Sequence, residues 1–175
     1  MKSQSKLASV VVADTGPLIA LAKASLLELM SALFGRVYIP EAVAMELQLD
    51  SARPDSAALR RAIDSGSSFC VRKAKAISAQ LAERLDAGEA EAIALASELG
   101  AVLLVDERKG RAAALHENVS IIGTGRLLLA AKKRGHVAQV GPILATLRQH
   151  GYRLADSLAE YILAEAAELP CKEKN

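Results

Sequence analysis

Short runs of aliphatic residues alternate along this chain with longer stretches in which hydrophobic residues recur at helical spacing. The clearest runs are Ser9–Ala13 (SVVVA) and Ala101–Val105 (AVLLV), whose aliphatic side chains predict buried strands. Strands that alternate with helices along a sequence are typical of a parallel sheet with crossover helices. The pattern therefore predicts an α/β fold built on a parallel sheet.

Turn-forming residues and helical spacing place the other elements. Further strands are predicted at residues 37–39 and 119–122, whereas residues 69–72 form either a strand or an extended connection. Gly35 is predicted to stop a helix. We find no repeat and no linker, so residues 1–175 are expected to form one domain, with C-terminal helices from about residue 140 and a polar tail at 170–175. The predicted helices cover residues 17–23, 25–33, 40–49, 56–65, 78–85, 86–100, 107–116, 123–135, 141–149 and 156–168.

Composition narrows the possible functions. The chain of 175 residues is 51% hydrophobic and 3% aromatic, and its 22 basic and 20 acidic residues leave a net charge of +2. The hydrophobic content excludes a disordered chain, the charge balance argues against a strongly basic nucleic-acid-binding protein, and the few aromatic residues argue against a base-stacking platform. The cysteines and histidines are too scattered to indicate a zinc site: Cys70, Cys171, His116, His136 and His150.

The N-terminal residues loosely imitate a signal peptide, because Lys2 and Lys6 precede the apolar stretch Leu7–Ala13. Asp14 interrupts this stretch, and Lys23 follows soon after. No apolar run reaches the ~18 residues that a membrane-spanning helix needs. We therefore expect a cytoplasmic protein without a membrane partner.

Two carboxylates end the two apolar strands. Asp14 follows SVVVA, and Asp106 follows AVLLV. In open α/β sheets, ligands bind beyond the carboxyl ends of the strands, so acids at two such ends indicate a common site. Each acid could instead cap the next helix, but their repetition at two buried strands favours a shared chemical role.

Glutamates on two predicted helices add to this pair. Glu46 falls near the middle of the apolar arc of helix 40–49, where a carboxylate is costly unless it is paired or binds a metal. The alternative is that Glu46 lies at the rim of this arc and reaches water. On the next helix, Asp86 and Glu89 have the spacing of a capping box, which gives Glu89 a structural task. Glu91 points to the other side of that helix and remains as a candidate.

The four candidate acids, Asp14, Glu46, Glu91 and Asp106, suit a divalent cation. Mg²⁺ prefers oxygen ligands and keeps several waters, and grouped carboxylates repel one another unless a cation neutralises them. One or two such ions can generate hydroxide and polarise a phosphate without help from His or Lys. Because the chain shows no Cys–His or Ser–His arrangement, metal-assisted hydrolysis is the chemistry that these acids favour.

The acids stand in motifs that resemble the PIN-domain family of metal-dependent ribonucleases. The matching stretches follow the family's order as far as Gly135: VVVADTGPLIALAK, VYIPEAVAMEL, LDAGEAEAIALA, LLVDERKGRAA and IIGTGRLLLAAKKRG. The resemblance carries the family's acids to Asp14, Glu46, Glu91 and Asp106. It implies a three-layer α/β/α sandwich and hydrolysis of RNA with Mg²⁺ or Mn²⁺. It also implies a homodimer and, as in many bacterial and archaeal members, a toxin with a small antitoxin partner.

The chain departs from the family in two places. Leu104 and Val105 stand where many members have Thr or Ser shortly before the final acid, and the turn Gly123–Gly125 is similar to that of a less-characterised PIN-like subgroup. The helices beyond Gly135 belong to none of the matching motifs, and we expect them to serve dimerisation or partner binding.

Polar and basic residues near the acids are candidates for auxiliary roles. Thr15 could bond a metal-bound water or a phosphate, or it could cap the helix that begins at Pro17. Thr124 could meet a phosphate at a helix N-terminus, but a capped turn is the simpler interpretation because the chain lacks a P-loop sequence. Candidates for contact with the RNA backbone follow strand ends: Arg108, Lys109, Arg111 and Arg126.

The sequence thus predicts a metal-dependent endoribonuclease in which metal-activated water attacks the RNA phosphate. The alternative is a non-catalytic PIN-like regulator that binds RNA or a protein, against which the retention of four acids argues. A phosphotransfer enzyme built on Asp14-Thr15-Gly16 is a third hypothesis. It is disfavoured because the chain lacks the second Asp that such enzymes use as acid and base.

Overall fold

The structure is a computed structural model that describes residues 8–49, 53–66 and 68–169. Lys2, Lys6, part of the predicted loop at 50–55 and the predicted tail at 170–175, which includes Cys171, lie outside the described residues. Within the described part of the chain, no single helix is long and apolar enough to span a membrane.

Five parallel strands form the sheet in the order β3-β2-β1-β4-β5. They are β1 (Ala8–Ala13), β2 (Phe34–Pro40), β3 (Phe69–Arg72), β4 (Val102–Leu104) and β5 (Ile121–Ile122). The predicted parallel α/β fold is confirmed, and residues 69–72 form a strand. Because β2 pairs with one edge of β1 and β4 with the other, the strand order reverses at β1. The carboxyl ends of β1 and β4 therefore flank the switch point at which α/β proteins bind ligands.

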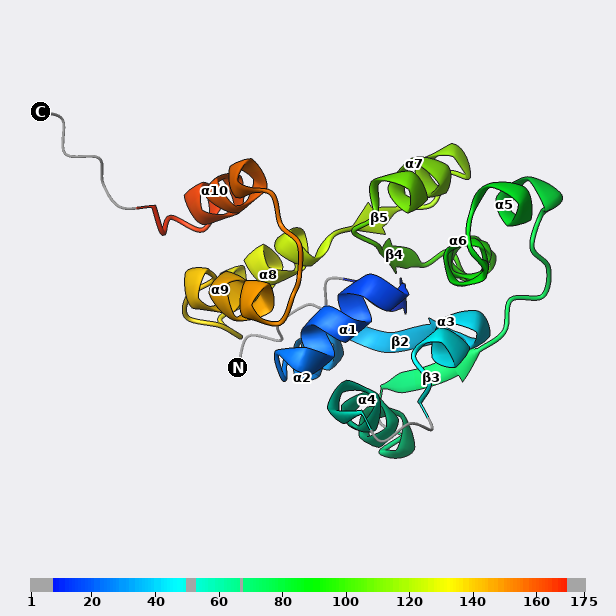
Figure 1. Cartoon of the computed structure of the whole chain (residues 1–175), viewed down its shortest axis with the longest axis horizontal. Coiled ribbons are helices and arrows are strands. Elements are labelled where there is room, and N and C mark those ends of the chain that lie inside the picture. Colours follow the sequence, from blue (N-terminus) through cyan, green and yellow to red (C-terminus); the bar gives the residue numbers. More distant parts are fainter. Residues whose placement is uncertain (1–7, 50–52, 67, 170–175) are drawn as a thin grey trace, which may run out of the picture.

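Helices cover both faces of the sheet and give the three layers that the family resemblance implies (Figure 1). Alternate strand residues point to opposite faces. Val11 and Leu104 join the core under α1, α2 and α8, whereas Val12 and Leu103 join the core under α6 and α7. The helices are α1 (Thr15–Lys23), α2 (Leu27–Leu33), α3 (Glu41–Glu46), α4 (Pro54–Asp64), α5 (Ala79–Arg84), α6 (Ala87–Leu99), α7 (Arg108–His116), α8 (Thr124–Lys133), α9 (Gly141–Gln149) and α10 (Asp156–Glu165).

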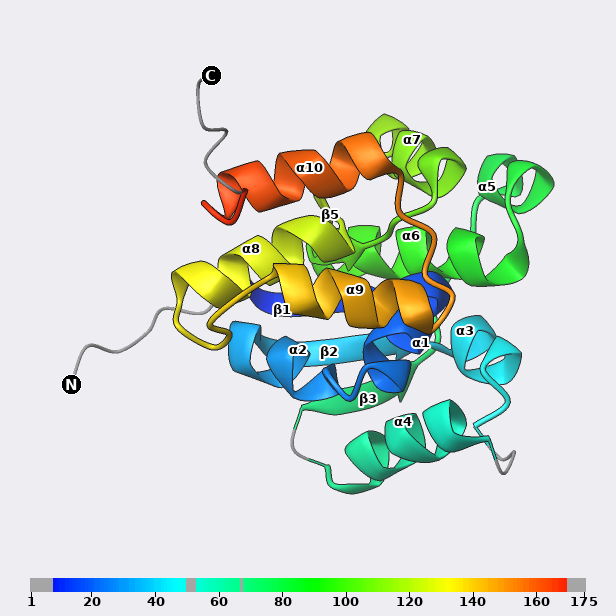
Figure 2. The ribbon, with the colours of Figure 1, turned by 60° about the vertical axis from the view of Figure 1, so that its left-hand side comes forward.

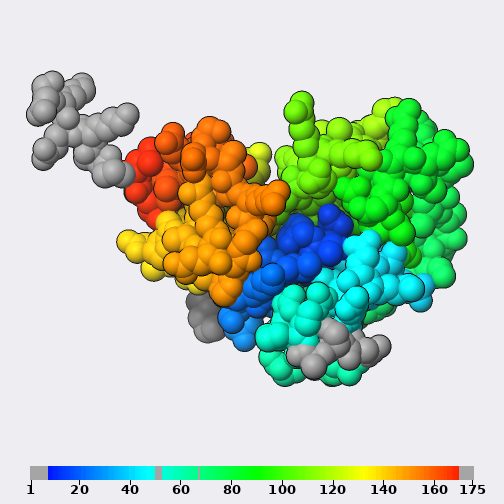
Figure 3. Space-filling model, in the orientation of Figure 1, coloured from blue at the N-terminus to red at the C-terminus, as the bar shows by residue number. Residues whose placement is uncertain are grey.

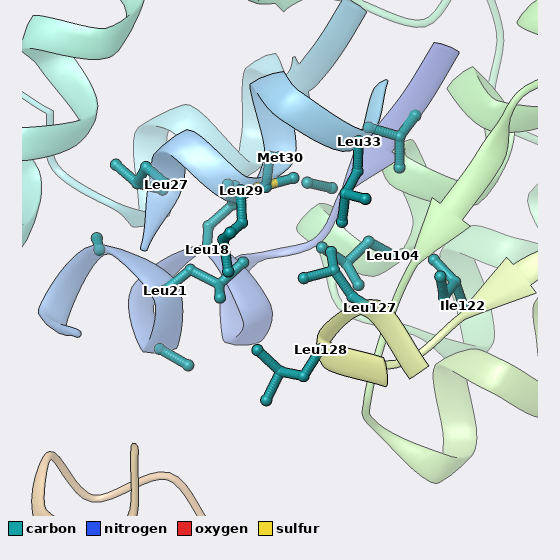
Figure 4. Close-up of a cluster of buried hydrophobic side chains, with 14 of the residues drawn as sticks. Leu18, Leu21, Leu27, Leu29, Met30, Leu33, Leu104, Ile122, Leu127 and Leu128 are labelled. Atoms are coloured by element: carbon teal, nitrogen blue, oxygen red, sulfur yellow. The ribbon is translucent and has the colours of Figure 1, made fainter. Parts of the chain in front are cut away.

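The larger core fixes the position of α1 on the sheet. Leu18 of α1 and Met30 and Leu33 of α2 face Leu104 of β4 and Leu127 of α8 (Figure 4). All five side chains are fully buried. Burial of a leucine or methionine side chain stabilises a fold by roughly 1.5–3 kcal/mol. The β1–α1 junction that carries the first candidate acid is therefore held firmly.

The structure contradicts the predicted role of Gly35 and the predicted end of the helix at 40–49. Gly35 lies inside β2 and does not stop a helix. A Cβ at this position would come 2.6 Å from the carbonyl oxygen of Ser9 on β1. Close approach of the neighbouring strand is thus the reason for this glycine. The helix predicted at 40–49 ends at Glu46, since Gln48 adopts a left-handed conformation with φ 46°.

The helices α9 and α10 fold back over α8 and α1 (Figure 2). Glu168, just after α10, binds one donor at the end of α8 and two at the start of α9. Its carboxylate accepts hydrogen bonds from Nζ of Lys132 (2.6 Å) and from the backbone N–H groups of Val140 and Gly141 (both 2.7 Å). The N-terminus of α9, the end of α8 and the end of α10 are thereby tied together.

Candidate active site

Asp14 lies at the switch point, directly after β1, and is 6% exposed. Burial raises the pKa of Asp14 from 3.8 to about 7, against a hydrogen bond from the backbone N–H of Thr15 that lowers it. The charges of three further acids add to the rise: Glu89, Asp86 and Glu46. Positive charge beside Asp14 would stabilise its ionised form.

Glu46 reaches Thr15 from the end of α3. Its Oε2 accepts a hydrogen bond from Oγ1 of Thr15 (2.6 Å), and its Oε1 accepts one from the backbone N–H of Gly88 in α6 (3.2 Å). A Cβ at position 88 would lie 2.5 Å from Oε1 of Glu46, so glycine leaves room for this carboxylate. The Thr15 hydroxyl therefore orients Glu46 and does not cap α1.

The apolar arc predicted for the helix at 40–49 is only partly buried. Val43 and Leu47 are buried, but Met45 is 73% exposed and Glu46 is exposed as well. Glu46 thus lies at the rim of the buried face, which was the alternative interpretation. Its carboxylate is nevertheless bound to two neighbours and is held beside Thr15.

The first turn of α6 brings two more acids to this place. Asp86 caps the helix as predicted, by accepting the backbone N–H of Glu89 (2.8 Å). The Glu89 carboxylate lies against α7, where a Cβ on Gly110 would be 3.1 Å from its Oε1. Burial raises the pKa of Glu89, and the charges of Asp86 and Glu107 add to this. Among the neighbouring acids, Glu89 has the largest charge effect on the pKa of Asp14, which places its carboxylate near Asp14.

Glu91 is not one of the acids whose charges raise the pKa of Asp14. Glu91 is 3% exposed, and both of its carboxylate oxygens accept backbone N–H groups. Oε2 binds Ala42 in the first turn of α3 (2.6 Å), and Oε1 binds Ala74 after β3 (3.0 Å). These bonds connect α6 to α3 and to the segment beyond β3, which is a structural role.

Asp106 lies on the other side of the switch point, after β4, and is bound by the turn that follows β5. Its Oδ1 accepts the backbone N–H of Thr124 (2.8 Å), and its Oδ2 accepts the Thr124 hydroxyl (2.6 Å). Arg111 lies beside this group and donates to the carbonyl of Val105 (3.1 Å). Burial, and then the charge of Asp106, raise the pKa of Tyr152 in the α9–α10 connection.

The basic candidates fall into two classes. Arg111 is bound to Val105 within the Asp106 group. Arg108 and Lys109 are exposed in the first turn of α7, and Arg126 is exposed on α8. Figure 3 shows a hollow between the C-terminal helices (orange) and the α7 region (light green), with the α1 region (blue) at its base.

Carboxylate oxygens such as those around Asp14 are ligands that hard divalent cations prefer. Among the described residues, no group of three His, Cys, Asp or Glu side chains is arranged to hold a metal ion. Mg²⁺, however, commonly binds through one or two carboxylates and retains its other waters. Burial and the charges of Glu89, Asp86 and Glu46 disfavour the ionised form of Asp14, which a hard divalent cation would stabilise.

The model of the family DUF3368, whose description is PIN domain, matches residues 10–168. The chain belongs to the PIN-domain family. PIN domains are generally nucleases and typically use divalent metals. The family match extends over α9 and α10, so these C-terminal helices are part of the PIN domain in this family, although no sequence motif above includes them.

Among solved structures, this PIN domain is similar to a PilT N-terminus domain protein from the hyperthermophilic archaeon Sulfolobus solfataricus P2. The identity is 20% and the TM-score is 0.48, over 70% of this chain and 92% of that chain. No curated protein matches the chain.

Proposed function

We propose that the protein is a divalent-metal-dependent endoribonuclease that hydrolyses RNA phosphodiester bonds. The observation that carries this proposal is the burial of Asp14 at the switch point, under the negative charge of other acids, in a chain of the PIN-domain family. Grouped carboxylates oppose their own ionisation, and a divalent cation relieves this opposition. A bound Mg²⁺ or Mn²⁺ would supply an activated water and polarise the phosphate.

The chain's own acids have distinct tasks in this proposal. Asp14, Glu46 and Glu89 would hold the cation from β1, α3 and α6, and Asp106 would complete the site from β4. We assign Glu91 a structural role, because it is 3% exposed and its carboxylate connects α6 to the first turn of α3 and to the segment beyond β3. Retained waters would let these carboxylates act without all of them contacting the ion directly.

Residues beside the acids have two tasks in this proposal: some orient the carboxylates, and others would bind the RNA backbone. The Thr15 hydroxyl and the Gly88 N–H hold the Glu46 carboxylate, so little reorganisation is needed when RNA arrives. Arg108 and Lys109, exposed at the start of α7, would contact phosphates of the RNA backbone. Such contacts position RNA without reading its bases.

The test is cleavage of a single-stranded RNA by the purified chain in Mg²⁺, in Mn²⁺ and in EDTA. We expect cleavage with metal and a loss of more than about 100-fold in Asp14→Asn and Asp106→Asn. Asp64→Asn, an exposed acid on α4, is the matched control and should cleave as wild type. Absence of cleavage in wild type with either metal, or cleavage at the wild-type rate in the two site variants, would overturn the proposal.

The alternative, a regulator that binds without cleaving, would show RNA or protein binding and no cleavage products with either metal. The toxin role, the antitoxin partner and the homodimer come from the family resemblance and are part of the proposal. Expression of the chain alone should then arrest bacterial growth, and Asp14→Asn should not. Sedimentation of the purified chain should show a dimer.

A further inference from the structure

A groove runs between α5 and α7, both of which lie next to α6 (Figures 1 and 2). Its apolar floor consists of Leu81 and Leu85, from α5 and its end, and of Ala113 from α7. Both leucines are buried, so the floor is recessed below the surface. The groove has a volume of about 340 Å³, which is within the range of pockets that bind small ligands.

The groove begins beside the acids of the candidate site. Lys109, in the first turn of α7, lines the groove. The next residue, Gly110, lies against Glu89, because a Cβ on Gly110 would be 3.1 Å from Oε1 of Glu89. On the opposite wall, Leu85 lines the groove and directly precedes Asp86, the cap of α6. The groove is therefore continuous with the site on the side of Glu89.

Positive charge lies at the rim of this groove. Arg84, in the last turn of α5, and Lys109 are both exposed, and within the part of the chain that the structure describes neither forms an ion pair. The acid of the lining, Glu117, is half-buried, and its Oε1 lies 3.6 Å from Nδ1 of His116, with which it pairs when His116 is protonated. Two unpaired cations beside an apolar floor favour a ligand that carries phosphates next to an apolar group.

The shape of the groove favours a nucleotide over a protein segment. Protein interfaces depend on large side chains that project into a pocket of the partner. The large apolar side chain that projects from α7 is Leu115, which is 59% exposed, and it does not line the groove. The apolar residues that do line it are recessed behind charged ones, as in a pocket for a small ligand group.

We propose that the groove between α5 and α7 is a subsite for one nucleobase of the RNA, near the phosphate that is cleaved. In this proposal Leu81, Leu85 and Ala113 contact the base, and Arg84 and Lys109 hold the phosphates beside it. The inference rests on the proposed nuclease function, because it takes RNA as the substrate of the site. It adds a contact that requires a base, whereas contacts with phosphate alone do not.

The test measures the Kd of two fluorescently labelled probes by anisotropy in Mg²⁺. One probe is a short single-stranded RNA, and the other is a chain of abasic nucleotides with the same number of phosphates. All proteins carry Asp106→Asn, so that the RNA stays intact. Ala112→Leu enlarges an exposed side chain that lines the groove. We expect this change to weaken RNA binding by about 10-fold and to change binding of the abasic chain by less than about twofold, because only RNA loses a base contact.

Two further variants separate the base from the phosphates. Ala82→Leu makes the same change at an exposed alanine of α5 that does not line the groove, so both probes should bind as they do to the parent protein. Lys109→Ala should weaken the binding of both probes alike, because a phosphate contact does not depend on the base.

Three results would overturn the proposal: no binding of RNA by the parent protein, equal weakening of both probes by Ala112→Leu, or unchanged RNA binding in this variant. The last result is also the one expected if the groove binds a protein segment. Cleavage of the same RNA by the chain with its native Asp106, in Mg²⁺ and in Mn²⁺, tests the nuclease separately. Loss of base-dependent binding in Ala112→Leu without cleavage by wild type would refute the nuclease and retain the subsite, and cleavage without that loss would do the reverse.

Discussion

Replacing Asp14 by Asn should stabilise the metal-free protein at alkaline pH while abolishing its response to metal. The change removes a buried negative charge and keeps the shape of the side chain. Burial and neighbouring acids raise the pKa of Asp14 from 3.8 to about 7. At ~1.36 kcal/mol per pKa unit, ionised Asp14 lowers the free energy of unfolding by about 4 kcal/mol. We expect about 2–4 kcal/mol to be recovered, because structural relaxation reduces such effects.

The sign of the pH dependence follows from the raised pKa. Below about pH 4, Asp14 is protonated in both the folded and the unfolded state, so its charge costs nothing. Between about pH 4 and pH 7 the unfolded state ionises first, and wild-type stability falls. Asn does not titrate, so the stability difference between Asp14→Asn and wild type should grow across this window and stay constant above it.

Urea unfolding in EDTA, followed by far-UV circular dichroism, measures this difference, since the chain has no Trp for fluorescence. Addition of Mg²⁺ or Mn²⁺ near pH 8 should raise the stability of wild type and leave Asp14→Asn unchanged. Asp64→Asn is the control. Its stability should equal that of wild type at each pH, and Mg²⁺ or Mn²⁺ should raise its stability as in wild type. A stability difference that does not vary between about pH 4 and pH 8 would refute the reasoning.

Three further predictions use the same unfolding and cleavage assays. Glu91→Gln should lower the free energy of unfolding by about 1–3 kcal/mol, because the amide group of Gln cannot accept both backbone N–H groups that bind Glu91. Loss of cleavage at unchanged stability would instead indicate that Glu91 is catalytic. Gly88→Ala should displace the Glu46 carboxylate and lower cleavage by at least about 10-fold while the protein stays folded; wild-type cleavage would show that the carboxylate need not sit there. Glu168→Gln should remove a pH dependence. Burial raises the pKa of Glu168, but the bonds from Lys132 and two backbone N–H groups together lower it by more, so the net pKa lies below 4.5. The stability that Glu168 adds is therefore lost in wild type as the pH falls below 4.5, and the variant should lack this loss.

The sheet and the strand-end acids could be predicted because they depend on local pattern. SVVVA and AVLLV are continuous aliphatic runs, and an acid after each is visible in the sequence alone. The order of the motifs then indicated the family, and Glu46 was found by combining both arguments. Its actual partners, Thr15 and Gly88, lie 31 and 42 positions away, so no local pattern could show them.

The distinction between Glu89 and Glu91 could not be made from spacing. Both lie on a helix that is apolar almost all round, so the sequence does not show which side faces the strand ends. The capping box gave Glu89 a sufficient local explanation, and nothing in the sequence linked Glu91 to Ala42 or Ala74.

The bonds of Glu168 determine the stage at which the C-terminal helices lose conformational entropy, which is folding and not substrate binding. Lys132 and Glu168 are 36 positions apart, and their contact closes a large loop without a covalent link. The entropy lost in closing such a loop is borne during folding. The α9–α10 connection is then already ordered when a substrate arrives, so binding needs less further ordering on this side of the site. Because the contacts of Glu168 with Lys132, Val140 and Gly141 are hydrogen bonds and an ion pair, not a disulfide, reductants would leave them intact.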